Sequence, residues 1–427
     1  MSNSELINLL FEELTTKEII QPISNISSVF FDEPKLYFYS TKFNQAQKYF
    51  KASRFKVNTD NLAANGISST SKYLALIRCL GESVERFCQC CYDNKLIIFS
   101  SYDNLIKKHN KNVFDPKIYK KIPNINDKKM GWIKGYDLLK NKEIFIPAQL
   151  IYLNYQRANE PHLNPNISTG AAGGFSHEST ILNGIYEIIE RDAFMTIYLN
   201  RIRAKKIDLT GVNDKAIRTI TKYFQKYGLD VSVYDITNDL HIPAFLTILI
   251  DNLKNTPKIT LGIKSSLNVK KAILGSIEEA FQIRLYIRNE LLKRKSTVYE
   301  INGKKIKSIF DRVLFWLSSS NIQKLDFITK QTPQVVKFVS FKFNQIEELD
   351  EVKKRIQNKG LQVYYVDITL ANFKKLNYSV YKAIIPGLQP LYLDESEKEW
   401  KIDRLKTVAH YFGKKKLVIN TVPHPFL

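Results

Sequence analysis

Apolar positions that recur every three or four residues predict three long helices in this chain. They cover the segments SSTSKYLALIRCLGESVERFCQCCYDN (68–94), HESTILNGIYEIIERDAFMTIYL (177–199) and NVKKAILGSIEEAFQIRLYIRNELLKR (268–294). Ser and Thr residues at the start of the first segment suit a helix cap. A further amphipathic helix is expected close to the N-terminus.

Shorter apolar runs between these helices predict strands. Residues 95–155 alternate such runs with Lys, Asn and Pro, and STGAAGGF (168–175) is a glycine-rich turn. Two other segments share one order of elements: an amphipathic helix, a glycine, a β-rich run and Asp-Ile-Thr. Their glycines, Gly228 and Gly360, suit the position after a helix end. Repeated helix–turn–strand units predict a mixed α/β protein, in which the basic segment from about 293 to 325 is expected to be a mobile insertion.

Composition limits the class of protein. The chain has 427 residues and is 44% apolar, which is enough to bury a large core. Apolar runs are strand-sized, and the acidic, amphipathic N-terminus does not resemble a secretion signal, so a soluble cytoplasmic protein is expected. We expect an N-terminal segment (1–60), a catalytic domain (61–400) and a C-terminal tail (401–427).

The formal charge of +22 and the four cysteines each allow two interpretations. Lysines are scattered, which suits a basic surface but also attraction to a nucleotide, an acidic peptide or nucleic acid. Cys79, Cys88, Cys90 and Cys91 lack the spacing of a zinc site, so buried thiols are favoured over a metal-bound or reactive thiol.

A pair of glutamates and an arginine occurs twice with one spacing. On a helix, Glu82, Glu85 and Arg86 share one side, as do Glu187, Glu190 and Arg191. Four carboxylates brought together would repel unless a cation or bound protons intervened. Oxygen ligands of this kind suit Mg²⁺, and arginines suit phosphate, so a cradle for Mg²⁺ and a nucleoside triphosphate is one interpretation. The other is that these are solvated charges on surface helices.

The third helix carries a related set in Glu279, Gln282 and Arg284. Neither a Walker A motif nor a strand-linked G-x-G-x-x-G accompanies these residues. A bound nucleotide would therefore need a nonstandard site.

Several segments, in order, resemble the YcaO family, specifically its azoline-forming cyclodehydratases. ALIRCLGESVERF is similar to the first glutamate helix of that family, and STGAAGGFSHESTILNGIYEIIERDAF to its second. VYDITNDLHIPAFLTIL, AILGSIEEAFQIR, YKAIIPGLQPLYL and the final TVPHPFL resemble its later elements. Residues Arg78, Phe175 and Ser179 depart from the family pattern.

The resemblance implies an α/β fold with β-sheets packed by helices around a central ATP and Mg²⁺ site. It implies metal contacts for Glu82, Glu85, Glu190 and Glu279. It implies nucleotide or phosphate contacts for Arg86, Glu187, Arg191, Gln282 and Arg284. The C-terminal Pro423, His424, Pro425 and Leu427 are implied to reach the catalytic site as a flexible strand.

The implied activity is ATP-dependent cyclodehydration of Cys, Ser or Thr in a ribosomal precursor peptide, giving thiazoline or oxazoline. Implied partners are that peptide, a separate ThiF/E1-like leader-binding protein and a flavin-dependent dehydrogenase; a homodimer without membrane attachment is expected. Two alternatives keep the fold: thioamide formation with a TfuA-like partner, and a non-catalytic scaffold subunit. Nucleic-acid binding rests on charge alone.

Overall fold

The computed structural model describes residues 3–44, 55–57, 59, 62–109, 112–155, 157–163, 167–210, 212, 214–253, 256–294, 301–330, 335–338 and 348–426. Its α-helices are α1 (Asn3–Thr16), α2 (Lys72–Cys90), α3 (Tyr102–His109), α4 (Pro116–Tyr119), α5 (His177–Leu199), α6 (Lys215–Lys226), α7 (Val269–Arg294), α8 (Ile309–Leu317), α9 (Ser319–Ile322), α10 (Asp326–Thr329), α11 (Leu349–Gln357), α12 (Ala371–Lys374) and α13 (Ile402–Tyr411). Its strands are β1 (Ser24–Asn25), β2 (Tyr37–Lys42), β3 (Phe55–Val57), β4 (Ala63–Ser68), β5 (Cys91–Asp93), β6 (Ile98–Ser101), β7 (Lys129–Asp137), β8 (Lys142–Pro147), β9 (Ala171–Gly174), β10 (Lys205–Asp208), β11 (Leu229–Asp235), β12 (Ala244–Asp251), β13 (Ile259–Ser265), β14 (Val335–Lys337), β15 (Tyr364–Asp367) and β16 (Ser379–Ile384).

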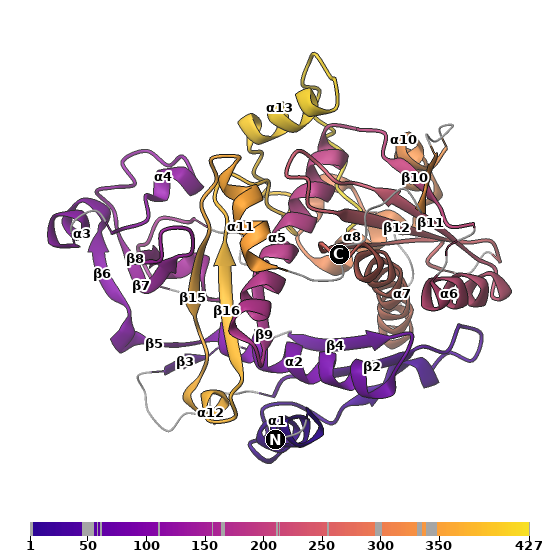
Figure 1. Ribbon diagram of the computed structural model, residues 1–427, viewed down its shortest axis with the longest axis horizontal. Coiled ribbons are helices and arrows are strands. Elements are labelled where there is room, and N and C mark those ends of the chain that lie inside the picture. Colours follow the sequence, from indigo (N-terminus) through magenta and orange to yellow (C-terminus); the bar gives the residue numbers. More distant parts are fainter. Residues whose placement is uncertain are drawn as a thin grey trace.

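Three sheets surround the longest helices (Figure 1). One has the order β1-β2-β4, a second β13-β12-β11-β10-β14, and a third β6-β7-β15-β16-β9 with β8 also paired to β7. Helix α5 contacts β16 and β9 of the third sheet and β13 and β12 of the second, so it lies between them. Helix α2 packs on β4, and α7 packs on β13 and reaches β4. The mixed α/β prediction is confirmed.

Burial explains why α5 occupies the centre. Nearly every residue from Thr180 to Leu199 is buried, including aromatic side chains such as Phe194 and Tyr198. A helix that is apolar around most of its surface must be covered on several sides. The three predicted long helices, including this one, are confirmed, as is the helix near the N-terminus.

The repeated helix–turn–strand unit is also confirmed. α6 leads through Gly228 into β11, and α11 leads through Gly360 into β15; both glycines have positive φ, at 67° and 68°. A left-handed residue after a helix is cheapest for glycine, which has no Cβ to collide with the backbone. The two units lie in different sheets.

The prediction of a mobile insertion after residue 293 is wrong for residues 301–330. This stretch holds α8, which begins with a capping box between Ser308 and Asp311. Phe315 and Trp316 of α8 lie in the same hydrophobic core as the end of α5. The segment is basic at its ends, but its middle forms an apolar helix that must be buried. Residues 295–300 lie outside the described part of the chain.

Along the described residues, the helices are either too short or too polar to cross a lipid bilayer. The four cysteines are buried and free. Burial raises the pKa of the Cys79, Cys88 and Cys90 thiols to about 12. These thiols therefore stay protonated and pack as small apolar groups, as the sequence favoured.

Candidate active site

Helix α2 brings the first glutamate pair to the edge of β4. The helix starts at Ser71, whose side chain caps the backbone N–H of Leu74. About three turns further along the helix, Glu82 accepts a hydrogen bond from the backbone N–H of Asn65 at 2.8 Å. Its other carboxylate oxygen lies 3.1 Å from the guanidinium of Arg86. The i,i+4 spacing of the sequence therefore forms a salt bridge that is tied to a strand edge.

Helix α5 places the second set in the same way. The backbone N–H of Gly170 donates to Glu187 at 2.8 Å, and the guanidinium of Arg191 lies 2.8 Å from the other oxygen of that carboxylate. Arg191 also donates to the hydroxyl of Thr169 at 2.7 Å. Gly170 has φ of +89°, and a Cβ there would lie 2.4 Å from the carbonyl oxygen of Ala383. Glycine is therefore required where the turn meets the site.

Glu190 and Glu279 bind alternate backbone N–H groups, two residues apart, on the free edge of β13. Glu190, on α5, accepts from the backbone N–H of Ser265 at 3.0 Å, and Glu279, on α7, accepts from that of Ile263 at 2.6 Å. The ammonium group of Lys264 lies 3.3 Å from Glu190. These bonds satisfy strand-edge donors with carboxylates from two different helices. Two helices that are distant in sequence thus present acidic groups at one place.

The electrostatics join these groups into one cluster. Burial raises the pKa of Glu85 to about 8, and Glu187 and Glu82 raise it further against the opposing effect of Arg86. Burial likewise raises the pKa of Glu279 to about 8, with Glu190 adding to it. Glu85 of α2 is thus within electrostatic range of Glu187 on α5, and Glu279 of α7 is within range of Glu190 on α5. Helix α5 therefore carries acidic groups that face both α2 and α7, and a shared metal site for the two glutamate pairs stays a prediction.

Glu187 and Glu190 respond differently to the same surroundings. Burial acts to raise the pKa of Glu187, but Arg191 and the N–H of Gly170 outweigh it and lower that pKa. Burial raises the pKa of Glu190 despite Lys264. Glu187 is thus the ionised member that holds the arginine, whereas Glu190 lacks full compensation.

The donor set fits a hard cation. Within the described residues, no three His, Cys, Asp or Glu side chains are already arranged as metal ligands. Glu190 and Glu279 each use one oxygen on β13, and their second oxygens, like the carboxyl group of Glu85, have no hydrogen bond or ion pair with the described residues. Oxygen ligands that repel one another would be relieved by a divalent cation such as Mg²⁺. Residues Glu85, Glu190 and Glu279 would hold it.

A buried lysine, which the sequence analysis missed, faces the same cluster. Lys382 on β16 donates to the carbonyl oxygens of Thr169 at 2.6 Å and Ile167 at 3.2 Å. Burial lowers the pKa of Lys382 to about 7, and Arg191 adds to this while Glu187 opposes it. Strand alternation alone could not reveal it, because only packing of β16 on α5 turns Lys382 toward these charges.

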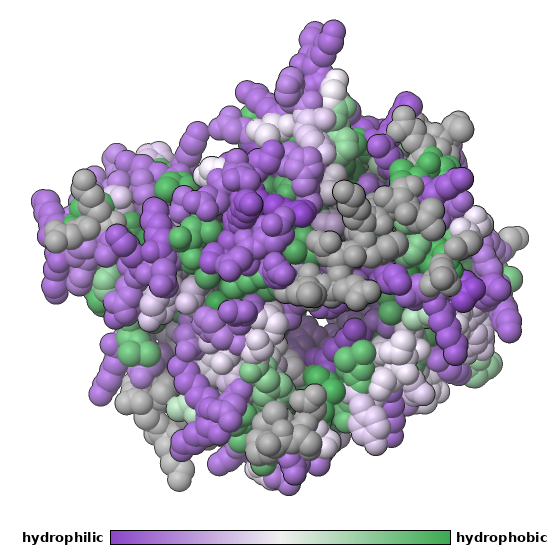
Figure 2. Space-filling model, in the orientation of Figure 1, coloured by the Kyte–Doolittle hydropathy of each residue, from purple (hydrophilic) through white to green (hydrophobic). Residues whose placement is uncertain are grey.

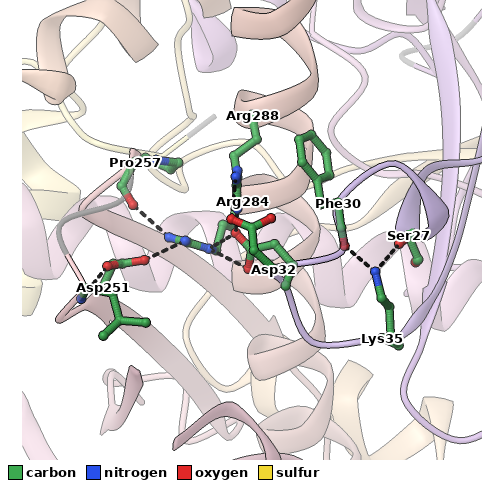
Figure 3. Close-up of polar contacts among 10 residues, drawn as sticks. Ser27, Phe30, Asp32, Lys35, Asp251, Pro257, Arg284 and Arg288 are labelled. Atoms are coloured by element: carbon green, nitrogen blue, oxygen red, sulfur yellow. Dashed lines mark hydrogen bonds and ion pairs between the residues drawn. The ribbon is translucent and has the colours of Figure 1, made fainter. Parts of the chain in front are cut away.

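Arg284 does not belong to this cluster, contrary to the prediction of a phosphate contact. Its guanidinium donates to Asp251 at 2.6 Å and to the carbonyl of Pro257 at 2.8 Å (Figure 3). It also donates to Glu33 at 2.8 Å. Arg288 also pairs with Glu33. Arg284 is buried and engaged by these groups, so it ties α7 to the N-terminal segment and to the end of β12. Five positions separate it from Glu279, which turns it toward another side of the helix.

Gln282 and the C-terminal residues take other positions. Gln282 is half-buried on α7, three residues beyond Glu279. Pro423, His424 and Pro425 are buried, which corrects the expectation of a flexible tail. Tyr198 of α5 donates to the carbonyl of Pro423 at 3.0 Å. Leu427 lies outside the described residues.

The buried tail nevertheless approaches the cluster. Arg312 of α8 donates to the carbonyl of His424 at 2.8 Å, and the imidazole of His424 bonds the carbonyl of Tyr392 at 2.6 Å. Burial and Arg312 lower the pKa of His424 well below its usual value, and Arg191 contributes to that shift. The histidine is therefore neutral and packed, with the arginine of the site in electrostatic range.

A second hydrogen-bond network connects sequence motifs whose role the sequence alone did not explain. Asp192, next to Arg191, is fully buried and accepts from Arg404 of α13 at 2.7 Å. It also accepts from the side chain of Asn238 at 2.8 Å and from the backbone N–H of Gln389 at 2.8 Å. The carboxylate thus joins α5, the β11–β12 turn, the PGLQP segment and α13. Asn238 and Gln389 lie in motifs of the sequence and Arg404 does not, and their shared acceptor is visible only in the fold.

Arg78, a departure from the family pattern, forms its ion pair with a glutamate outside the acidic cluster. It pairs with Glu278 of α7 at 2.7 Å, and Glu278 accepts from the backbone and hydroxyl of Ser69. This ion pair fastens the start of α2 to α7. It leaves the carboxylates between the two helices without an extra cation from Arg78.

Figure 2 shows the molecule hollowed near its centre, where hydrophilic residues face inward between the lower and upper parts.

Comparison with known proteins agrees with this arrangement. Residues 68–389 match the model of a family described as YcaO cyclodehydratase, binding ATP and Mg²⁺. The match includes α2, α5, α7 and β16, which carry the cluster. A Rhizobium leguminosarum bv. trifolii protein, described as lying in the tfuA 3′ region, is 28% identical over 170 residues, or 38% of this chain and 40% of the relative.

Two solved structures show the same fold at low sequence identity. One is a heterocyclase in complex with substrate and cofactor, with a TM-score of 0.74, 18% identity and coverage of 97% of this chain and 57% of the other. The second is YcaO from Methanopyrus kandleri with AMPPCP and Mg²⁺, with a TM-score of 0.65, 15% identity and coverage of 93% of both chains. The chain therefore spans little more than half the length of the first structure.

Proposed function

The chain belongs to the YcaO family, and from that premise we propose that it uses ATP and Mg²⁺ to activate a backbone amide in a ribosomally made precursor peptide. The observation that carries this proposal is the set of glutamates from α2, α5 and α7. The pKa values of Glu85 and Glu279 are raised to about 8 even though Arg86 acts on the first and Lys264 on the second, so a metal would supply positive charge that these cations do not. Such a set costs stability unless it binds a cation.

The proposed product is a thiazoline or oxazoline. The thiol or hydroxyl of Cys, Ser or Thr attacks the carbonyl carbon of the preceding residue, and the carbonyl oxygen takes the γ-phosphoryl group of ATP. That oxygen leaves as phosphate while the amide nitrogen loses its proton and forms a C=N bond. The peptide thus loses one water, and ATP becomes ADP and phosphate. Phosphorylation turns a poor leaving group into a good one.

The residues divide this work by charge. Glu85, Glu190 and Glu279 would hold Mg²⁺, which supplies charge neutralisation for the phosphates when bound. Arg86 and Arg191 are held by Glu82 and Glu187, which fixes the orientation of both guanidinium groups. The Nε of Arg191 is buried without a hydrogen-bond partner among the described residues, so it can donate to a ligand oxygen.

The precursor peptide and a leader-binding partner are part of this proposal. The formal charge of +22 favours an acidic leader. The heterocyclase that shares this fold was solved with its substrate, which is consistent with a peptide substrate for this chain. A ThiF/E1-like partner and a flavin-dependent dehydrogenase remain predictions.

Mass spectrometry tests the function. The protein, a candidate precursor and its partner are incubated with ATP and Mg²⁺, and the peptide carries ¹⁸O in the carbonyl before the reacting Cys. We expect loss of one water and ¹⁸O in the released phosphate. Glu85→Gln should abolish both, whereas Glu143→Gln, which alters an exposed pair with Lys134, should not. Water loss without ¹⁸O in phosphate would contradict the mechanism.

Thioamide formation is the second candidate. The relative described as lying in the tfuA 3′ region favours it, because a TfuA-like partner is the one expected for thioamidation. The same activated carbonyl would then accept sulfide in place of a side chain. In the same experiment with sulfide and a TfuA-like protein, exchange of oxygen for sulfur would identify this activity, and loss of water would identify ring formation.

A further inference from the structure

A small cavity lies beside the acidic cluster and shares two of its cations. Its volume is about 60 Å³, several times the roughly 10–15 Å³ that one water needs on this measure. Aliphatic side chains of α5, β16 and the following loop form most of its wall, including Ile188, Ile384, Ile385 and Leu388. Arg191 and Lys382 also line it. The cavity is thus apolar along one side and cationic along another.

The wall of the cavity is fixed by the same contacts that position the residues of the candidate active site. Ile188 directly follows Glu187 on α5, and Lys382 lies two residues before Ile384 on β16. The backbone N–H of Ala383 donates to the carbonyl of Gly170 at 2.7 Å, which fastens β16 to the glycine turn. The cavity is therefore a fixed feature of the site rather than a gap between loops.

The cations at its wall identify where a reacting oxygen would lie. Arg191 uses its terminal nitrogens on Glu187 and Thr169, and its buried Nε has no partner among the described residues. A buried donor without an acceptor favours a ligand oxygen at that point. A carbonyl oxygen that gains negative charge during the reaction suits such a donor best.

We propose that this cavity binds the aliphatic side chain of the substrate residue immediately before the cyclised Cys, Ser or Thr. The proposal rests on the proposed function, since the carbonyl under attack belongs to that residue. With its carbonyl oxygen at Arg191, the side chain of the same residue is one bond from the backbone and enters the apolar wall. Glycine would leave the cavity unfilled, and aspartate would bury a charge against Ile188 and Leu388. The chain would therefore select precursors with an aliphatic residue such as Leu before the reacting position.

The test uses labelled synthetic hexapeptides, Gly-Gly-Xaa-Cys-Gly-Gly with Xaa as Leu, Gly or Asp. Binding is measured with the full chain, Mg²⁺ and a non-hydrolysable ATP analogue. We expect the Leu peptide to bind at least about tenfold more tightly than the Gly and Asp peptides. Equal binding of the three, or none, overturns the proposal.

Variants locate the preference in the cavity. Ile188→Phe and, independently, Ile384→Phe fill it and should remove the preference for Leu, while Ile118→Phe on the exposed face of α4 should keep it. Nucleotide affinity should stay unchanged in each folded variant. Loss of nucleotide binding with the Leu preference retained would assign the cavity to the base of the nucleotide and overturn the proposal.

Mass spectra of the same peptides, with ATP and the partner, separate this proposal from the proposed function. A Leu preference in binding without water loss or sulfur exchange from any peptide would refute the proposed function and keep the subsite. Water loss from Leu and Gly peptides at equal rates would keep the function and refute the subsite.

Discussion

Replacing Glu85 by Gln tests whether the acidic cluster is a cation site. The folded protein raises the pKa of Glu85 to about 8 from an ordinary 4.5. The folded state therefore keeps a proton that the unfolded state loses, so stability falls as pH rises from about 4.5 to about 8. The ceiling on this loss is about 5 kcal/mol, at about 1.4 kcal/mol for each of the three and a half pH units. Partial exposure and solvent screening reduce it to about 1–2 kcal/mol.

Glutamine resembles the protonated carboxyl group, so the variant should lack this loss. Near pH 4 the two proteins should have nearly equal unfolding free energies, and near pH 9 the variant should be about 1–2 kcal/mol more stable, with the difference growing across the range between. Urea unfolding at several pH values measures this difference. Glu143→Gln serves as the control, because Glu143 lies in an exposed pair with Lys134 and its replacement should show no such pH-dependent gain.

Mg²⁺ binding should depend on pH in the opposite direction from folding stability. Mg²⁺ needs the ionised carboxylate, so Mg²⁺ and nucleotide should release about 0.9 proton from Glu85 at pH 7, beyond any from Glu279. Calorimetry in buffers of different ionisation enthalpy counts those protons. The variant should release about one proton fewer and bind Mg²⁺ with AMPPCP at least tenfold more weakly, as expected on loss of a ligand. Unchanged affinity together with unchanged proton release would refute a ligand role for Glu85.

Three other variants probe the supports of the site. Arg284→Met removes the buried cation that Glu33 and Asp251 share and should cost about 3–5 kcal/mol in urea unfolding, with the nucleotide affinity of the folded protein unchanged; a selective loss of affinity would restore the phosphate role. Gly170→Ala, at φ +89° with a contact of 2.4 Å to Ala383, should lower the thermal midpoint more than Gly360→Ala, which has open space; equal shifts would contradict the steric argument. Burial lowers the pKa of His424, so as pH falls the unfolded chain binds a proton before the folded chain does, and stability should fall below about pH 6.5. His424→Gln should remove that pH dependence. An identical pH profile in both proteins would show that another group is responsible.

The sequence motifs predicted the main helices of the fold and the contacts of the site that form within one helix. Periodicity predicted α2, α5 and α7, and the glycines at 228 and 360 predicted two helix ends. The spacing of Glu82 with Arg86 and of Glu187 with Arg191 is local, so two salt bridges followed from helix geometry alone. The resemblance to the family added the expectation that these pairs meet.

Tertiary packing decided the remainder, because a side chain's role depends on what lies across from it. Arg284 and Arg191 look alike in sequence, but one meets Glu33 and Asp251 and the other reaches the cluster. The tail that read as a flexible proline segment is buried through Tyr198 and Arg312, which come from helices far away in sequence. Nothing in the sequence indicated that Lys382 belongs to the site, because the surroundings of a residue on a strand depend on the helix that packs over it. Spacing along a chain fixes neighbours within a helix, whereas burial and charge between elements arise only when the sheets close around α5.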